Sequence, residues 1–368
     1  MPAGINRQWV VASRPRGAVA ETDFSYREAP LPTIGDGQFL VRTLFVSVDP
    51  GLRGWLTRSP EYLSQALDLY LDAYFVTRGQ MRVPPEYSAP LHIGSVMCSQ
   101  GLGQVVESHH PDYAVGDFVT GLLGWQDYCS SDGATRVPVS RFKRVHPLPR
   151  YLGVLGNSGM TAYFGMLDVA RPREGETVLV SGAAGATGSI AAQIARIQRC
   201  RVIGIAGGPE KRRWLTEELG LDAAIDYKSE NIDLRLTELC PDGVNVYFDN
   251  VGGRTLEIVL DHMATWGRIA LCGTISAYDH GGTPAGPANL ARLATSRIRM
   301  EGFLAPDYGP RYREARRQLS AWLATGSLKP CEHIHEGFEN IPRAFLGLFQ
   351  GTNIGKAMVK LTDVPIAR

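Results

Sequence analysis

Short runs in which apolar and polar residues alternate fill the first part of the chain. The run FLVRTLFVSVDP at 39–50 ends at a proline, and glycines interrupt two similar runs at 101–108 and 116–129. Short alternating runs bounded by turn residues are typical of half-buried strands. They predict a β-rich domain, either a barrel or a sandwich, over residues 1–150.

From about Leu152 the pattern changes to strongly apolar runs that alternate with amphipathic stretches. Strands that alternate with helices of this length are typical of an α/β domain with a doubly wound parallel sheet. The predicted strands are 177–182, 201–207, 223–227, 245–253 and 267–276, and the predicted helices are 189–199, 209–220 and 256–266. Beyond them we expect helices at 312–326 and 341–351 and a strand at 356–361.

Another helical pattern, SPEYLSQALDLYLDAYF, lies at 59–75. Ser59 can cap this helix and Pro60 can occupy its first turn, while aromatic and apolar residues recur at helical spacing. We interpret it as a surface helix that docks on the β-rich domain through its aromatic face. A lid or a subunit contact is the alternative.

The stretch SGAAGATGS at 181–189 lies between a predicted buried strand and a predicted helix. Glycines let the backbone approach a pyrophosphate closely, and the N-terminus of the next helix offers free N–H groups to it. The spacing is G-x-x-G-x-x-G rather than the commoner G-x-G-x-x-G, so a turn packed for steric reasons is the alternative. The strand–loop–helix setting favours a dinucleotide-binding turn.

The choice between NAD(H) and NADP(H) depends on the end of the next predicted strand. A carboxylate there binds the ribose hydroxyls of NAD(H) and repels a 2′-phosphate. This strand ends in Ala206-Gly207-Gly208, and Lys211, Arg212 and Arg213 follow it. Because a lysine attracts a 2′-phosphate, the sequence predicts NADP(H) as the cofactor.

Length and charge narrow the class of protein further. The chain has 368 residues, more than the roughly 250–300 at which single cores usually stop growing, so two domains are expected. A formal net charge of +1 argues against nucleic-acid or anionic-membrane partners. No stretch reads as a signal peptide or membrane span, so we expect a cytoplasmic protein. The six cysteines form no C-x-x-C pair, which indicates reduced thiols.

Motifs spread over nearly the whole chain resemble those of the zinc-independent medium-chain dehydrogenase/reductases. The resemblance is strongest to the alkenal double-bond reductases, which include prostaglandin and curcumin reductases. Together these motifs are far more specific than the glycine loop. They are NRQWVVASRPRG (6–17), SVDPGLR (47–53), GLGQVVES (101–108), LGNSGMTAYFGMLD (155–168), YFDNVGG (247–253), CGTISAYD (272–279), RMEGFL (299–304), EGFENIPRAFLGLFQG (336–351) and TNIGKAMVKL (352–361).

The resemblance implies a discontinuous architecture with the active site in the cleft between two domains. Residues 1–151 would form a β-rich, GroES-like catalytic domain, and residues 152–330 a Rossmann domain that binds NADP(H). Residues 331–368 would return to the catalytic domain. Members are commonly homodimers that pair through the edge of the nucleotide-binding sheet, for which Met300–Leu304 is the candidate here.

Cofactor contacts carried over from the family fall on the glycine loop and on the ends of the later strands, with Lys211 at the 2′-phosphate. Tyr227 matches a tyrosine that contacts the phosphate and adenosine side, and Asn250 matches a contact on the nicotinamide side; the alternative for both is that they only cap strand ends. We expect the Cys272 side chain to pack in the interior, with only its backbone near the cofactor. The set implied by the resemblance is Gly185, Ala186, Thr187, Gly188, Lys211, Tyr227, Asn250, Cys272, Gly273, Thr274, Ile275, Ser276, Tyr278, Phe303, Leu304, Ala305 and Asn353.

Zinc members of the superfamily carry a ligating cysteine near the position of Val48 and Asp49 and then a Gly-His-Glu motif, and this sequence has neither. His92 is the nearest histidine, with no Cys or Glu arranged around it. A catalytic zinc needs three protein ligands, so we expect no metal. Without a Lewis acid, alcohol oxidation is disfavoured. The expected reaction is NADPH-dependent hydride transfer to the β-carbon of a small α,β-unsaturated aldehyde or ketone.

Negative charge builds on the carbonyl oxygen in this reaction, so a hydrogen-bond donor must lie near it. Tyr278 is the candidate catalytic residue, because a phenol stays protonated at neutral pH and family members carry a tyrosine here. Packing against the nicotinamide ribose is its alternative role. Tyr163 is a candidate wall of the substrate pocket. Gly51 stands where many relatives have a tyrosine, and it completes the expected pocket.

Two other functions share this fold. A quinone oxidoreductase would use the same zinc-free architecture and NADPH, and matched enone and quinone assays would separate the two. A non-catalytic member would bind NADPH as a structural protein, because a fold does not by itself determine function. Quenching of protein fluorescence by NADPH without turnover would indicate the second.

Overall fold

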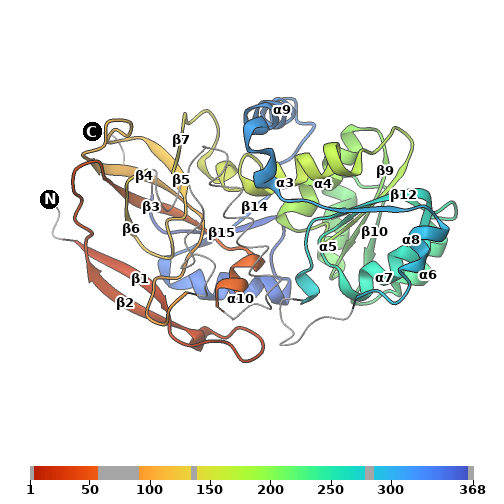
Figure 1. The fold of residues 1–368 in the computed structure, drawn as a ribbon, viewed down its shortest axis with the longest axis horizontal. Coiled ribbons are helices and arrows are strands. Elements are labelled where there is room, and N and C mark those ends of the chain that lie inside the picture. The colour runs from red at the N-terminus through yellow and green to blue at the C-terminus, as the bar shows by residue number, and fades with distance from the viewer. Residues whose placement is uncertain (1–3, 57–90, 134–138, 278–285, 364–368) are drawn as a thin grey trace. The chain divides into compact units, whose positions relative to one another are not determined.

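The computed structural model describes residues 4–56, 91–133, 139–277 and 286–363 (Figure 1). Contacts divide the chain into two compact units. The first unit contains residues 1–152, 332–353 and 357–368, and the second contains 153–331 and 354–356. The helix expected at 59–75 lies outside the described residues.

The first unit is built on a sheet whose strands, among the described residues, run in the order β14-β15-β3-β4-β5-β7, with β6 also paired to β3. A separate antiparallel pair joins β1 to β2. This unit is the β-rich domain that the alternating runs predict. Its strands are β1 (Ile5–Val11), β2 (Phe24–Pro30), β3 (Phe39–Ser47), β4 (Gly101–Ser108), β5 (Phe118–Gly121), β6 (Tyr128–Ser131), β7 (Ser140–Phe142), β14 (Glu332–Glu336) and β15 (Lys356–Lys360).

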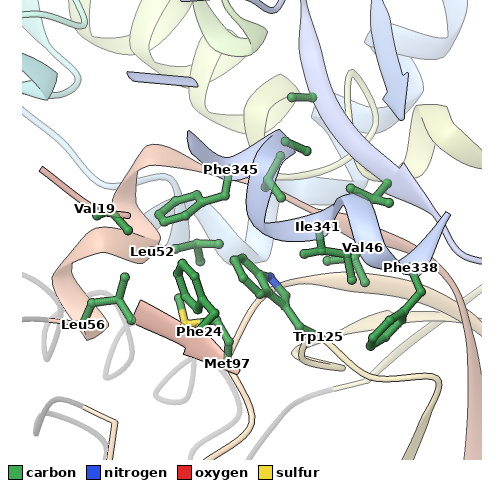
Figure 2. Packing of buried hydrophobic residues seen from close by; sticks show 14 of the residues in the cluster. Val19, Phe24, Val46, Leu52, Leu56, Met97, Trp125, Phe338, Ile341 and Phe345 are labelled. Carbon is green, nitrogen blue, oxygen red and sulfur yellow. The ribbon is translucent and has the colours of Figure 1, made fainter. Parts of the chain in front are cut away.

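Aromatic side chains from distant parts of the sequence form the core of the first unit (Figure 2). The Trp125 ring lies 4.8 Å from that of Phe24 and 5.7 Å from that of Phe345, measured between centroids. Phe345 comes from α10 (Ile341–Gln350), which follows a short 3₁₀ turn at Phe338–Asn340. Burial of these apolar faces explains why the chain returns to this unit after completing the second.

The second unit contains a six-stranded sheet in the order β10-β9-β8-β11-β12-β13 within the described residues. All five neighbouring pairs are parallel. Numbered by sequence, this order is 3-2-1-4-5-6, that of a Rossmann fold, and it confirms the predicted fold class. The strands are β8 (Thr177–Ser181), β9 (Arg201–Ala206), β10 (Ala223–Asp226), β11 (Val244–Asp249), β12 (Met263–Leu271) and β13 (Arg299–Gly302).

Apolar residues on both faces of this sheet are buried, which is why its strands read as continuous apolar runs. In β8, Val178, Leu179 and Val180 are all fully buried although successive side chains point to opposite faces. The accompanying helices are α3 (Asn157–Phe164), α4 (Ala186–Ile197), α5 (Pro209–Arg213), α6 (Ile232–Leu239), α7 (Gly253–His262), α8 (Ala291–Thr295) and α9 (Tyr312–Ala324). No helix in the described ranges is long and apolar enough to cross a bilayer.

The helix predicted at 256–266 ends earlier, because its last residues join the sheet. The strand β12 begins at Met263, which pairs with Val244 of β11. The register then shifts, and Trp266 takes a left-handed backbone with φ 65°. Pairing with β11 thus outweighs the helical periodicity of the sequence, a common override of local propensity by tertiary contacts.

Candidate cofactor site

The glycine loop joins β8 to α4 in a backbone arrangement that requires glycine at two positions. Gly182 has φ 58°, in the left-handed region that L side chains disfavour. A Cβ on Gly188 would lie 2.9 Å from the carbonyl carbon of Gly182 and closer still to its oxygen. The first turn of α4 is therefore packed directly against the end of β8.

The N-terminus of α4 is open to an anion. Gly185 is the N-cap residue, and no described side chain caps the N–H groups of the first turn. Gly185, Ala186 and Thr187 are only partly buried. Free N–H groups at the positive end of a helix dipole suit a pyrophosphate, and the close backbone approach leaves no Cβ in its way. The loop therefore fits the dinucleotide that the sequence predicts.

The segment 354–356 fixes the position of this loop. The Gly355 N–H donates to the carbonyl of Ala184 at 2.7 Å, and Gly355 forms an isolated parallel bridge with Gly185. Asn353, an expected cofactor contact, immediately precedes this segment in the chain. The loop is thus anchored by a segment that lies about 170 residues away in the sequence, which the local sequence pattern does not reveal.

Side chains from the end of β10 cover the glycine that follows β9. A Cβ on Gly207 would lie 2.8 Å from the Tyr227 ring and 3.0 Å from Cε of Lys228. Tyr227 is 52% exposed, which leaves its ring open to a ligand. Lys211 of α5 is partly buried, and this burial together with the charge of Lys228 lowers the pKa of its ammonium group. Lys211, expected at the 2′-phosphate, and Tyr227, expected on the phosphate and adenosine side, thus adjoin the ends of neighbouring strands.

Asp226 is a site residue that the sequence reasoning missed. It is 3% exposed, and its carboxylate accepts the backbone N–H of Gly208 at 2.6 Å, that of Lys228 at 3.1 Å, and the hydroxyl of Ser229 at 2.8 Å. Burial alone would raise the pKa of Asp226, but these hydrogen bonds outweigh it and the pKa is lowered. An acid at the end of a strand was a visible signal, although its role here is to order the turn after β9.

Asn250 lies where the strand order reverses, between β8 and β11. Its side-chain amide donates to the carbonyl of Ser181 at 2.7 Å, and its backbone N–H donates to the Ser181 hydroxyl at 3.0 Å. That hydroxyl donates in turn to the buried carboxylate of Asp249 at 2.9 Å. Ligands of open α/β sheets bind at such a reversal point, outside the carboxyl ends of the strands. The Asn250 amide thus caps the end of β8, as its alternative role describes, and its contact with the cofactor stays a prediction.

The run from Cys272 to Ser276 follows β12 and is hydrogen-bonded to the turn after β11. The Cys272 N–H donates to the Asp249 carbonyl at 2.8 Å, and the Ser276 N–H donates to that of Val251 at 3.2 Å. Burial, with a smaller effect of Asp249, raises the pKa of the Cys272 thiol to about 12, so it stays protonated. Gly273, Thr274 and Ile275 lie in the same run.

Phe303, Leu304 and Ala305 follow β13, the last strand along the sheet. The Phe303 ring packs edge-on against Phe248 with centroids 6.2 Å apart. Gly165 makes room for this ring, because a Cβ there would lie 2.8 Å from Cε2 of each of the two phenylalanines. The expected contacts from β8 to β13 therefore gather at the carboxyl ends of one parallel sheet.

The expected substrate pocket is described only in part. The Tyr163 hydroxyl lies 3.5 Å from the Glu314 carboxylate of α9, and burial followed by the Glu314 charge raises its pKa. Gly51 is exposed on the 3₁₀ helix Pro50–Trp55, with no described atom within 4 Å of a Cβ built there. Tyr278 lies outside the described residues. In those that are described, no three His, Cys, Asp or Glu side chains gather to hold a metal ion.

Comparison with known proteins gives the family. Residues 186–324 match the family model "Zinc-binding dehydrogenase", and residues 7–70 and 63–139 match "N-terminal domain of oxidoreductase". The chain is 40% identical over 363 residues to NADPH-dependent curcumin reductase of Escherichia coli K12, with 97% of each chain covered. The chain belongs to the medium-chain dehydrogenase/reductase family.

Two further members of this family are similar to the chain. The NADP⁺-dependent 2-alkenal reductase of Nicotiana tabacum is 39% identical over 301 residues, which cover 80% of this chain and 86% of the relative. The crystal structure of CurA from Vibrio vulnificus in complex with NADPH superposes with a TM-score of 0.85 at 37% identity, covering 97% of this chain and 100% of the other. The expected resemblance is confirmed.

Proposed function

We propose that this protein reduces the carbon–carbon double bond of α,β-unsaturated aldehydes or ketones with NADPH. The observation that carries the proposal is the identity of 40% across nearly the full chain to a relative named NADPH-dependent curcumin reductase. The relative named 2-alkenal reductase supports the same reaction class. The site supports the cofactor, because a glycine turn leads into a helix whose first N–H groups no described side chain caps. Lys211 follows a strand end that lacks the acid of NAD-binding chains.

In this proposal each group of site residues has a separate task. The N–H groups of Gly185–Gly188 bind the pyrophosphate, while Lys211 and Tyr227 bind the phosphorylated ribose. The nicotinamide side is positioned by Asn250 and by the backbone of Cys272–Ser276. Phe303, Leu304, Ala305 and Asn353 complete the binding surface. When bound, NADPH supplies the hydride for the β-carbon of the substrate.

The protein must then stabilise the charge that develops on the carbonyl oxygen. Tyr278 remains our proposed hydrogen-bond donor, and a preorganised donor lowers such a barrier by about 3–4 kcal/mol. Tyr163 and Gly51 are proposed to line the substrate pocket. The first unit would be the catalytic domain and the second the NADP-binding domain.

Three further features of the proposal concern the state of the protein. We propose that it works without zinc, because the sequence lacks the ligating cysteine and the Gly-His-Glu motif of the zinc members. We propose a homodimer that pairs along the sheet edge at Met300–Leu304, because β13 ends the strand order among the described residues. We propose that it acts in the cytoplasm.

The test is the consumption of NADPH with a panel of enals, enones, quinones and saturated aldehydes, with the products identified. We expect turnover of enals and enones to saturated carbonyl compounds that keep the aldehyde or ketone group. Alcohol products, or turnover confined to quinones, would refute the proposed reaction. A matched assay with NADH tests the cofactor separately.

A further inference from the structure

A second lysine adjoins the strand end where NAD-binding chains carry their ribose-binding acid. Lys228 follows β10 and is exposed. Its Cε lies 3.0 Å from the position that a Cβ on Gly207 would take, beside the Tyr227 ring. The side chain therefore lies back over the backbone at the end of β9. Only a glycine at position 207 leaves room for this arrangement.

Lys228 and Lys211 of α5 both adjoin the backbone that follows β9, since Lys228 lies over Gly207 and α5 begins at Pro209. The positive charge of Lys228 is, after burial, the next cause of the lowered pKa of Lys211. Two like charges repel each other, so each disfavours the protonated form of the other. The charge of Glu210 offsets part of this effect, because it raises the pKa of Lys211, but the pKa remains lowered. A dianion bound between them would relieve this repulsion.

The nearby acid does not neutralise the pair. Asp226 attracts Lys228 electrostatically, yet its oxygens already accept hydrogen bonds from two backbone N–H groups and from the Ser229 hydroxyl. The Asp226 side chain is 3% exposed, so it faces the turn rather than the solvent. It holds the backbone of Gly208 and Lys228 in place and leaves the Lys228 ammonium available to a ligand.

We propose that Lys228 is a second cationic contact to the 2′-phosphate, so that Lys211 and Lys228 together determine the preference for NADP(H). This inference rests on the proposed use of NADPH and adds a specificity-determining residue to it. The two lysines approach the phosphate from different elements, α5 and the β10 end, with Tyr227 beside them. Two lysines that hold one phosphate from two sides discriminate NADP(H) from NAD(H) more strongly than a single flexible lysine does.

The test measures binding of 2′,5′-ADP and 5′-AMP to the whole protein by calorimetry, which requires no turnover. These two probes differ only in the 2′-phosphate. We expect Lys228→Gln to weaken 2′,5′-ADP binding by roughly two- to fivefold, the effect of losing one exposed ion pair, and to leave 5′-AMP binding unchanged. The Lys211→Gln variant and the double variant complete a double-mutant cycle. If both lysines bind the same phosphate, the losses in binding free energy of the two single variants do not add up to the loss of the double variant.

Arg213→Gln is the matched control for the loss of one positive charge. It lies two positions after Lys211 on α5, so its side chain points to roughly the opposite side of the helix. This variant should bind both probes like the wild type. A Lys228→Gln variant that binds 2′,5′-ADP with wild-type affinity overturns the inference. So does a variant that loses affinity for both probes equally. If the wild type itself shows no preference for 2′,5′-ADP, the NADPH assignment fails with it.

Discussion

Substitution of Gly188 by alanine tests whether the close turn between β8 and α4 is what binds the pyrophosphate. The added Cβ would lie 2.9 Å from the Gly182 carbonyl carbon and 3.0 Å from Cα of Ala183, and nearer still to the Gly182 oxygen. All three atoms belong to the backbone, so no change of rotamer relieves the contact. The first turn of α4 must move away from the loop.

The expected cost follows from two opposing effects. Alanine favours a helix over glycine by about 1 kcal/mol, whereas overpacking of this kind costs about 1–3 kcal/mol. Because rigid backbone atoms make the contact, the clash should dominate and leave a net loss of roughly 1 kcal/mol. For a unit of this size such a loss lowers Tm by about 2–4 °C. Displacement of the N–H groups should weaken NADPH binding by at least about tenfold, the effect of losing one charge-assisted hydrogen bond.

Thermal unfolding and NADPH titration by fluorescence measure the two effects on the same sample. Gly35→Ala is the control, since its Cβ would have only one neighbour within 4 Å, the Gln38 side chain at 3.8 Å. This control should change neither Tm nor NADPH affinity appreciably. If Gly188→Ala instead retains both the wild-type Tm and the wild-type NADPH affinity, the loop geometry does not create the binding site.

Four further predictions concern other parts of the molecule. Lys211→Ala should raise the KM for NADPH by about tenfold and leave that for NADH unchanged, and a wild type that prefers NADH would contradict this. Tyr278→Phe should lower kcat with an enone by roughly 100-fold or more if its hydroxyl is the donor, whereas unchanged turnover removes Tyr278 from that role. Asp226→Asn should destabilise the protein above pH 4. Because the pKa of Asp226 is lowered in the folded protein, its ionised carboxylate stabilises the fold above the pKa of the unfolded chain, and this stabilisation is lost as pH falls. The difference in the free energy of unfolding between wild type and variant, measured in urea, should therefore shrink toward pH 3. Phe345→Ala should cost about 3–5 kcal/mol in the free energy of unfolding, because it opens a cavity beside Trp125, and Phe345→Leu should recover most of it.

The regular elements of the second unit were the most predictable part of the fold. A parallel strand is buried on both faces, so its sequence is apolar throughout and stands out from the amphipathic helices. The boundary between α7 and β12 was predicted wrongly. The residues from Met263 to Trp266 continue a helical pattern, and only pairing with β11 draws them into the sheet. Local sequence cannot show a competing partner that lies on another strand.

The site shows the same division. The glycine spacing and the missing acid after β9 were visible in the sequence. Both depend only on residues that are neighbours in the chain, since the first reflects the backbone shape of one turn and the second the charge at one strand end. The role of Asp226 was not visible, since it depends on hydrogen bonds to Gly208 and Ser229 across a turn. The anchoring of Ala184 by Gly355 was also hidden, because the two residues meet only after folding.

The sequence by itself therefore predicted the class of each domain, a dinucleotide-binding turn at 181–189 and NADP(H) as the cofactor. These follow from periodicity, steric limits on glycine and the sign of nearby charges, all of which act over a few residues. The tertiary structure alone decided which strand ends meet. It brought Lys228, which follows β10, over Gly207, which follows β9. It also brought Asn250, which follows β11, onto Ser181 at the end of β8, because parallel strands far apart in the chain share one carboxyl edge.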